Sequence, residues 1–153
     1  QLLRSAETMQ TAFGRLKPLL EEARGGERRP VVIMATVEGD IHDIGKNIVS
    51  LMLGNHGFEV VDIGKDRTAD DIVAAAEEHG AVIIGLSALM TTTMVRMEDT
   101  VKLVKERDLP TKIIVGGAVV NAAFAEAIGA DGYSGDAVDC VRLVRELLNM
   151  PGN

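Results

Sequence analysis

The chain has 153 residues, 46% of them hydrophobic, and this length suits one domain with a core of its own. A formal net charge of −7 argues against nucleic acid as a partner, because phosphate binding requires a basic surface. The single cysteine, Cys140, excludes an internal disulfide and a cysteine-based zinc or iron–sulfur site. No charge-free run is long enough to cross a membrane, so we expect a cytoplasmic protein.

The N-terminal part differs in pattern from the rest of the chain. Residues 1–23 carry apolar side chains at helical spacing, which predicts an amphipathic helix that Pro18 interrupts. A polar, glycine-rich linker, 25–30, follows this helix.

From Val31 onward, apolar runs alternate with helical patterns. The apolar runs predict strands at 31–37, 58–63, 81–86, 112–115 and 130–133. The periodic segments predict helices at 46–56, after a cap at Thr68, at 94–107, at 119–128 and after a cap at Asp136. Five such units with right-handed crossovers predict an α/β fold, a five-stranded parallel sheet in the flavodoxin-like order 2-1-3-4-5.

The segment after the first strand, Gly39–Asn47, carries the most informative residues. Asp40 and His42 are two positions apart, so in an extended segment both point to the same side. A carboxylate beside an imidazole orients a metal-ligating histidine, although the same pair can also be a simple hydrogen bond. The spacing of Gly39 and Gly45 excludes a phosphate-binding P-loop, and no Rossmann glycine fingerprint follows the strand.

The motif Asp40-x-His42-x-x-Gly45 resembles the signature of cobalamin-binding domains. The longer string from Val37 to Val49 is similar to methionine synthase and to the corrinoid methyl-carrier proteins. The resemblance implies that His42 is the lower ligand of cobalt, in place of the cofactor's own base. It also implies contacts with the cofactor from the whole loop: Gly39, Asp40, Ile41, His42, Asp43, Ile44 and Gly45.

The loop after the third predicted strand contains Ser87 and three consecutive threonines. The residues alone are also typical of a helix that Thr92 or Thr93 caps. The resemblance assigns them more: Ser87 and Leu89 line the pocket of the cofactor's nucleotide tail, and Thr91 hydrogen-bonds that tail. Thr93 matches the hydroxyl residue that completes a relay with Asp40 and His42 in methionine synthase.

Small residues follow the last two predicted strands. Paired glycines after the fourth strand are compatible with a tight turn alone. In the similar families they leave space for the nucleotide tail, and the small residues after the fifth strand suit the same slot. The predicted contacts are Gly116, Gly117, Ala118, Ser134 and Gly135.

The resemblance implies cobalamin as the cofactor, as methylcobalamin or another corrinoid. We expect a cobalamin-binding module of a methyltransferase, most like methionine synthase, whose cobalt carries a methyl group. In that family His42 would ligate methylated cobalt and release it on reduction, while Asp40 and Thr93 share the proton. The expected partners are the folate-binding, homocysteine-binding and reactivation modules, so this chain alone would bind cofactor without turnover. Residues 1–29 would be a remnant of a helical cap with its linker, and 30–153 the cobalamin-binding domain.

Other interpretations remain open at this point. A free-standing corrinoid protein of a methylamine or methanol methyltransferase system has a similar Thr-Thr-Thr-Met segment after strand three. An adenosylcobalamin mutase domain, a cobalamin-based sensor and a cofactor-free interaction domain are the further alternatives. A phosphorylated receiver domain is rejected, because the third strand ends in Ser87 and offers no aspartate. His56 and His79 precede glycines at predicted helix ends and are expected to be structural.

Overall fold

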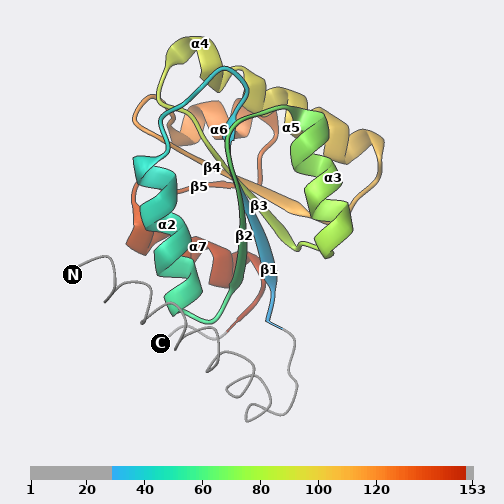
Figure 1. Ribbon diagram of the computed structural model, residues 1–153, viewed down its shortest axis with the longest axis vertical. Helices are drawn as coiled ribbons and strands as arrows, with labels where there is room; N and C mark the ends of the chain where they lie inside the picture. Colours follow the sequence, from blue (N-terminus) through green and yellow to red (C-terminus); the bar gives the residue numbers. More distant parts are fainter. Residues whose placement is uncertain (1–28, 151–153) are drawn as a thin grey trace, which may run out of the picture.

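The computed structural model describes residues 29–150, so the predicted helix over 1–23 lies outside the described residues. Five parallel strands form one sheet in the order β2-β1-β3-β4-β5 (Figure 1), which confirms the predicted fold class. The strands are β1 (Val31–Val37), β2 (Glu59–Arg67), β3 (Ile83–Ser87), β4 (Lys112–Gly116) and β5 (Gly132–Tyr133).

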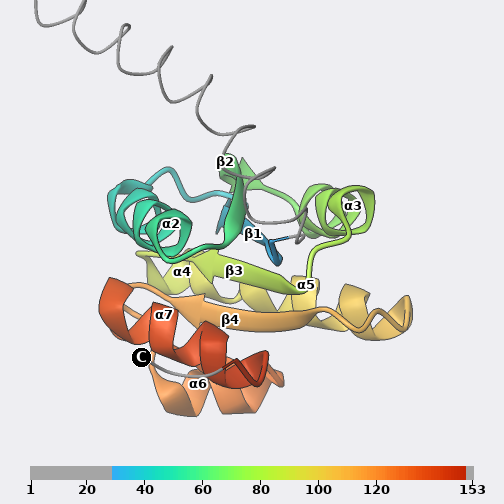
Figure 2. The same cartoon turned by 90° about the horizontal axis from the view of Figure 1, so that it is seen from below.

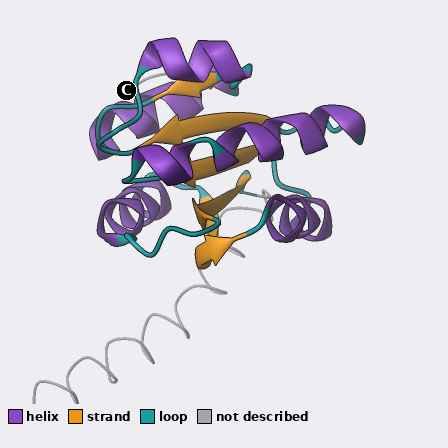
Figure 3. Ribbon diagram, turned by 90° about the horizontal axis from the view of Figure 1, so that it is seen from above, coloured by secondary structure: helices purple, strands orange, loops and turns teal. Residues whose placement is uncertain are grey.

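Helices cover both faces of this sheet, as βαβ crossovers require. Figures 2 and 3 show α2 and α7 on one side of the strands, and α3 and α5 on the other. Within residues 29–150, no helix combines the length and the apolar character needed to cross a bilayer. The helices are α2 (Ile44–Asn55), α3 (Ala69–His79), α4 (Thr91–Met94), α5 (Arg96–Glu106), α6 (Ala122–Ile128) and α7 (Ala137–Leu147).

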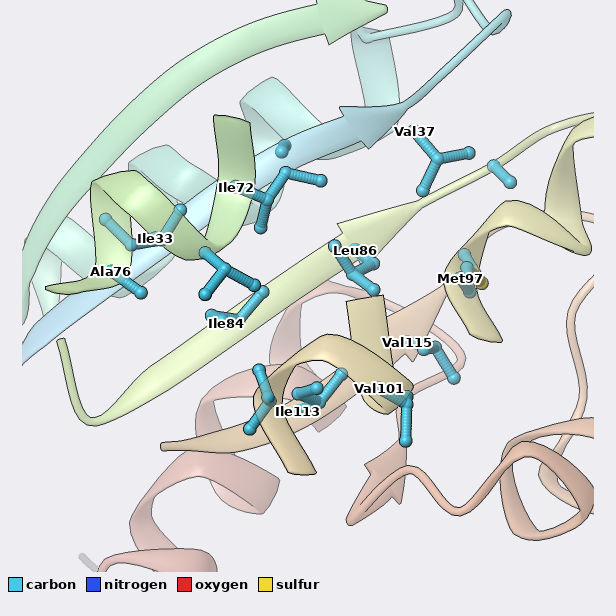
Figure 4. Packing of buried hydrophobic residues seen from close by; sticks show 14 of the residues in the cluster. Ile33, Val37, Ile72, Ala76, Ile84, Leu86, Met97, Val101, Ile113 and Val115 are labelled. Carbon is cyan, nitrogen blue, oxygen red and sulfur yellow. The ribbon is translucent and has the colours of Figure 1, made fainter. Parts of the chain in front are cut away.

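The core has two parts, one on each face of the sheet. The larger part lies between the sheet, α3 and α5 (Figure 4), and it includes Ile33, Ile72, Ile84, Met97, Val101 and Ile113. The smaller part lies under α2 and α7 and includes Val32, Leu53, Phe58, Ile83, Ile114 and Val144. Because β1 and β3 are buried on both faces, their unbroken apolar sequences follow from their central positions.

The observed elements differ from the predicted ones mainly at their ends. β2 continues to Arg67, beyond the predicted apolar run. Its pairing with β1 shifts register on both sides of Ala35, and these shifts bring Arg67 opposite Val37. The helix expected at 94–107 is divided into α4 and α5 by Val95. The helix expected from Val119 begins only at Ala122, since the Asn121 side chain caps it.

The predicted caps at Thr68 and Asp136 are present. Thr68 Oγ1 accepts a hydrogen bond from the Asp71 N–H at 3.1 Å. Asp136 Oδ1 accepts one from the Asp139 N–H at 2.7 Å. The second cap fixes the start of α7 directly after β5, at the same edge of the sheet as the loop that carries His42.

Candidate functional site

The loop between β1 and α2 turns sharply at the carboxyl edge of the sheet. Gly39 has a φ of 85°, a conformation that favours glycine, and the Asp40 N–H donates to the Val37 carbonyl oxygen at 3.0 Å. This turn directs the Asp40 side chain into the protein, where it is fully buried. The His42 side chain stays 45% exposed, so its ring is accessible at the rim of the sheet.

The Asp40 carboxylate accepts four hydrogen bonds, two on each oxygen. Oδ1 accepts from the His42 N–H at 2.9 Å and lies 2.7 Å from His42 Nδ1. Oδ2 accepts from the Leu89 N–H at 2.8 Å and from Thr93 Oγ1 at 2.6 Å. Burial raises the pKa of Asp40, but these hydrogen bonds outweigh it and hold the pKa well below its usual range. Asp40 is therefore ionised at neutral pH.

The ionised carboxylate determines the tautomer of His42. An ionised carboxylate can only accept hydrogen bonds, so the contact of Asp40 with Nδ1 requires a proton on that nitrogen. In the neutral imidazole, Nε2 then carries the free lone pair with which histidine binds metals. Thr93, Asp40 and His42 thus form a continuous hydrogen-bonded series, while the role of this series as a relay stays a prediction.

The structure corrects the interpretation of Thr92 or Thr93 as a helix cap. The residue at the N-cap position of α4 is Met90, and no side chain caps this helix. Thr93 lies inside α4, is 6% exposed, and directs its hydroxyl to Asp40. Its methyl group lies toward Gly39, because a Cβ added to that glycine would be 3.5 Å from Thr93 Cγ2.

A pocket of about 540 Å³ opens between α2, α7 and the carboxyl ends of β3, β4 and β5. Thr91, at the start of α4, is exposed and is not among the residues around this pocket. The lining includes Met34, Lys46, Tyr133 and Cys140, to which the sequence analysis assigned no contact with a ligand. The sequence-predicted contacts that line it are Gly45, Ser87, Leu89, Gly116, Gly117, Ala118, Ser134 and Gly135.

Two glycines of the pocket lining pack closely against neighbouring atoms. Gly117 has a φ of 130°, and a Cβ there would collide with the carbonyl group of Ala88. A Cβ at Gly85 would collide with the sulfur of Met34. At Gly117 the obstacle is main chain, so that position requires glycine, whereas at Gly85 the obstacle is the end of the flexible Met34 side chain, which can move.

Lys46, a buried residue of the pocket lining, forms an ion pair with the more exposed Asp62 of β2. Lys46 is 2% exposed, and its Nζ lies 2.6 Å from each carboxylate oxygen of Asp62 and 2.8 Å from Asn47 Oδ1. This contact joins the first turn of α2 to β2. This contact was not predicted from the sequence, although Lys46 shares a helix face with Val49 and Leu53, at spacings of three and seven residues.

Cys140 is buried in the smaller part of the core, as expected for a small apolar residue. Burial raises its pKa to about 11, against the effect of a hydrogen bond with Ser134. The thiol is therefore protonated at neutral pH and forms part of the apolar lining.

The surroundings of His42 suit a large ligand that brings its own metal. Within residues 29–150, no group of three or more His, Cys, Asp and Glu side chains converges to hold a free ion. A lone imidazole fits a metal whose other coordination positions are already filled by a macrocycle. Ile41 and Ile44, on either side of His42, are 64% and 78% exposed, and Leu89 is 41% exposed. Such exposed aliphatic side chains are typical of a surface that another molecule covers.

Comparisons with known proteins agree with this geometry. The sequence model of the family described as B12 binding domain matches residues 30–142. Dimethylamine corrinoid protein 3 of Methanosarcina mazei is 43% identical over 149 residues, which cover 96% of this chain and 89% of the relative.

Two solved structures share the fold at lower identity. The monomethylamine corrinoid protein of Methanosarcina barkeri has a TM-score of 0.75 and 35% identity, over 96% of this chain and 70% of that one. A chain of the methanol:cobalamin methyltransferase complex from the same organism has a TM-score of 0.76 and 30% identity, over 87% and 52%. The prediction of cobalamin as the cofactor is confirmed, and the chain belongs to the B12-binding domain family.

Proposed function

We propose that this chain is a corrinoid carrier of a methylamine- or methanol-type methyltransferase system, with His42 as the lower ligand of cobalt. The named relatives support this alternative better than methionine synthase, because they are corrinoid proteins for dimethylamine and monomethylamine and a complex acting on methanol. The partner would accordingly be a methyltransferase subunit that methylates the bound corrinoid, rather than folate- and homocysteine-binding modules. The cytoplasmic setting and the boundary at residue 30 are further parts of the proposal.

The protein's part in this function is to hold and orient one imidazole. When bound, the corrinoid supplies the methyl-transfer chemistry through its cobalt. His42 would present Nε2 from below, because Asp40 fixes the ring and keeps the proton on Nδ1. Thr93 would stabilise the negative charge of Asp40 by its 2.6 Å hydrogen bond. The protein would thereby fix the orientation of the imidazole and leave Nε2 available for the cobalt.

The pocket gives the proposal its second support. The displaced nucleotide tail of the corrinoid is long and carries a flat base, and the glycine-lined slot of about 540 Å³ is open at the same edge as His42. Ser87 and Ser134 would offer hydroxyls to the tail, while Gly116, Gly117 and Ala118 would leave room for it. The predicted hydrogen bond from Thr91 to the tail belongs to the proposal as well.

The observation that carries the proposal is the buried, ionised Asp40 between Thr93 and the exposed ring of His42. The test is electron paramagnetic resonance of cob(II)alamin bound to protein that contains ¹⁵N-labelled histidine. Nitrogen coupling from a ¹⁵N nucleus gives a doublet, whereas the ¹⁴N nucleus of the cofactor's own base gives a triplet. We expect the doublet in wild type and in the control His56→Ala, and its loss in His42→Ala. A triplet in wild type would refute ligation by His42.

The partner requires a separate experiment. The reduced, corrinoid-loaded chain is incubated with a methyltransferase specific for dimethylamine, monomethylamine or methanol, together with the matching substrate. We expect methylation of cobalt, followed by the visible spectrum, with at least one of these three pairs. If none of these three pairs methylates cobalt, but methyltetrahydrofolate with the corresponding module of methionine synthase does, the result would support a methionine synthase module instead.

A further inference from the structure

The residue Asp66, near the end of β2, contacts the loop that carries the proposed cobalt ligand. The Gly39 N–H donates to Asp66 Oδ1 at 2.8 Å, and the Asp66 N–H donates to the carbonyl oxygen of Asp40 at 3.0 Å. One residue therefore binds the loop on both sides of the Asp40 α-carbon. The loop after β1 and the end of β2 both lie at the upper end of the sheet in Figure 1.

The backbone of Asp66 is unusual in a way that serves these two contacts. Its φ of 55° lies in the left-handed region, which residues other than glycine rarely adopt. Asp66 lies between Gly64 and Arg67, which pair with Ala35 and Val37 of β1, and the register of the β1–β2 pairing shifts between these two pairs. In this conformation the N–H and the carboxylate of Asp66 both face the Gly39–Asp40 turn. Strain retained at one residue beside a site indicates that the surrounding contacts require it.

These contacts complete the support of the Asp40 main chain. The Asp40 N–H donates to the Val37 carbonyl oxygen, and the Asp40 carbonyl oxygen accepts from the Asp66 N–H. Both polar groups of the Asp40 backbone are therefore hydrogen-bonded. A side chain as short as that of aspartate has little independent reach, because only two torsions separate its oxygens from the main chain. The position of the Asp40 carboxylate, and through it that of the His42 ring, therefore depends on this backbone support.

We propose that Asp66 is a positioning residue for the cobalt ligand, acting through the Gly39–Asp40 turn on the orientation of His42. The inference rests on the proposed function for the identity of the ligand, but the orientation of the ring can be measured without cofactor. Among the described residues, Asp66 has no hydrogen bond with His42 and does not line the pocket, so we assign its effect to the main chain of the loop.

The test uses two substitutions that separate the carboxylate from the backbone conformation. Asp66→Gly removes the acceptor, and glycine adopts a positive φ without strain. Asp66→Asn keeps an acceptor oxygen and tolerates the same conformation. Asp108→Gly is the matched control: Asp108 has a φ of 51° and lies before β4, at the opposite edge of the sheet.

Two readouts are recorded on the full chain at constant pH. The first is ¹⁵N NMR of labelled histidines in the cofactor-free protein, which reports the share of His42 with its proton on Nδ1. The second is electron paramagnetic resonance of bound cob(II)alamin, in which the nitrogen coupling gives the ratio of histidine-ligated to unligated cofactor. For Asp66→Gly we expect a partial loss of the Nδ1-protonated form and a ratio about two- to tenfold lower, the effect of one hydrogen bond. Asp66→Asn and Asp108→Gly should stay within about twofold of wild type.

Each result decides the question. Unchanged tautomer and ligation in Asp66→Gly would overturn the inference, as would an equal loss in Asp108→Gly. An equal loss in Asp66→Asn would show that the acceptor oxygen is not what matters, which also overturns it. If wild type shows no coupling to a protein nitrogen, the proposed function fails, while the tautomer of the cofactor-free protein still decides the role of Asp66.

Discussion

Replacing Asp40 by asparagine tests the electrostatic basis of the site. The asparagine side chain has one oxygen and one amino group where the carboxylate has two acceptors, and all four of its partners are donors. In either orientation the amino group opposes a main-chain N–H, of His42 or of Leu89, in a fully buried position. Hydrogen bonds to a charged group contribute about 1.5–3 kcal/mol each. We therefore expect Asp40→Asn to lower the free energy of unfolding by about 3 kcal/mol at pH 7.

The pH dependence gives this prediction a second, independent part. Because the pKa of Asp40 is lowered on folding, its stabilisation is fully present above the unfolded pKa, about 3.9. It is lost as the pH falls from there toward the folded pKa. Asparagine cannot titrate, so the stability difference between wild type and variant should narrow by about 1 kcal/mol between pH 5 and pH 3.

Urea unfolding of the cofactor-free chain at pH 7, 5 and 3, followed by circular dichroism, measures both parts. Asp108→Asn, at an exposed position in a left-handed conformation that asparagine tolerates, is the control and should change little at any of these pH values. A loss below about 1 kcal/mol at pH 7, or a difference that does not narrow in acid, would refute the reasoning.

Three further substitutions have defined outcomes in the same unfolding assay. Thr93→Val keeps the shape of the side chain but removes the hydrogen bond to Asp40, and should cost about 2 kcal/mol at pH 7. Thr100→Val should be neutral or stabilise by up to about 1 kcal/mol, because the Thr100 hydroxyl is buried without a partner among the described residues; a loss above about 1 kcal/mol contradicts this. Gly117→Ala should cost about 2 kcal/mol or more, since its φ of 130° is unfavourable to alanine and the added Cβ meets a carbonyl group; an unchanged midpoint would show that the loop yields.

The parallel sheet could be predicted because each central strand is an apolar run and each crossover is long enough for a helix; the order 2-1-3-4-5 was chosen as the flavodoxin-like one. Element ends were harder to predict, and for physical reasons. The extension of β2 to Arg67 passes through polar residues whose pairing depends on the register slips of β1. The short helix α4 was not predicted before Met94, because Thr91, Thr92 and Thr93 have low helix propensity.

The candidate site was predictable where its residues are close in sequence or resemble a known motif. Asp40 and His42 are two residues apart and belong to such a motif, so their contact was expected. The Lys46–Asp62 pair and the two bonds of Asp66 were not found, because each joins the loop region to β2 across many residues and follows no fixed spacing. Contacts of this kind are set by the packing of the sheet, which a single sequence does not reveal.

The distribution of these contacts explains how a site built on loops can hold a ring in place. The Asp40 carboxylate receives bonds from Leu89 and Thr93, which are 49 and 53 residues further along the chain. Asp66 adds the support of β2 from the other side. The orientation of His42 thus depends on three segments at the same edge of the sheet: the loop after β1, the segment after β3 and the end of β2. Opening any one of them would weaken the hold on the imidazole, so the site gains its rigidity from the parallel sheet beneath it rather than from the loop itself.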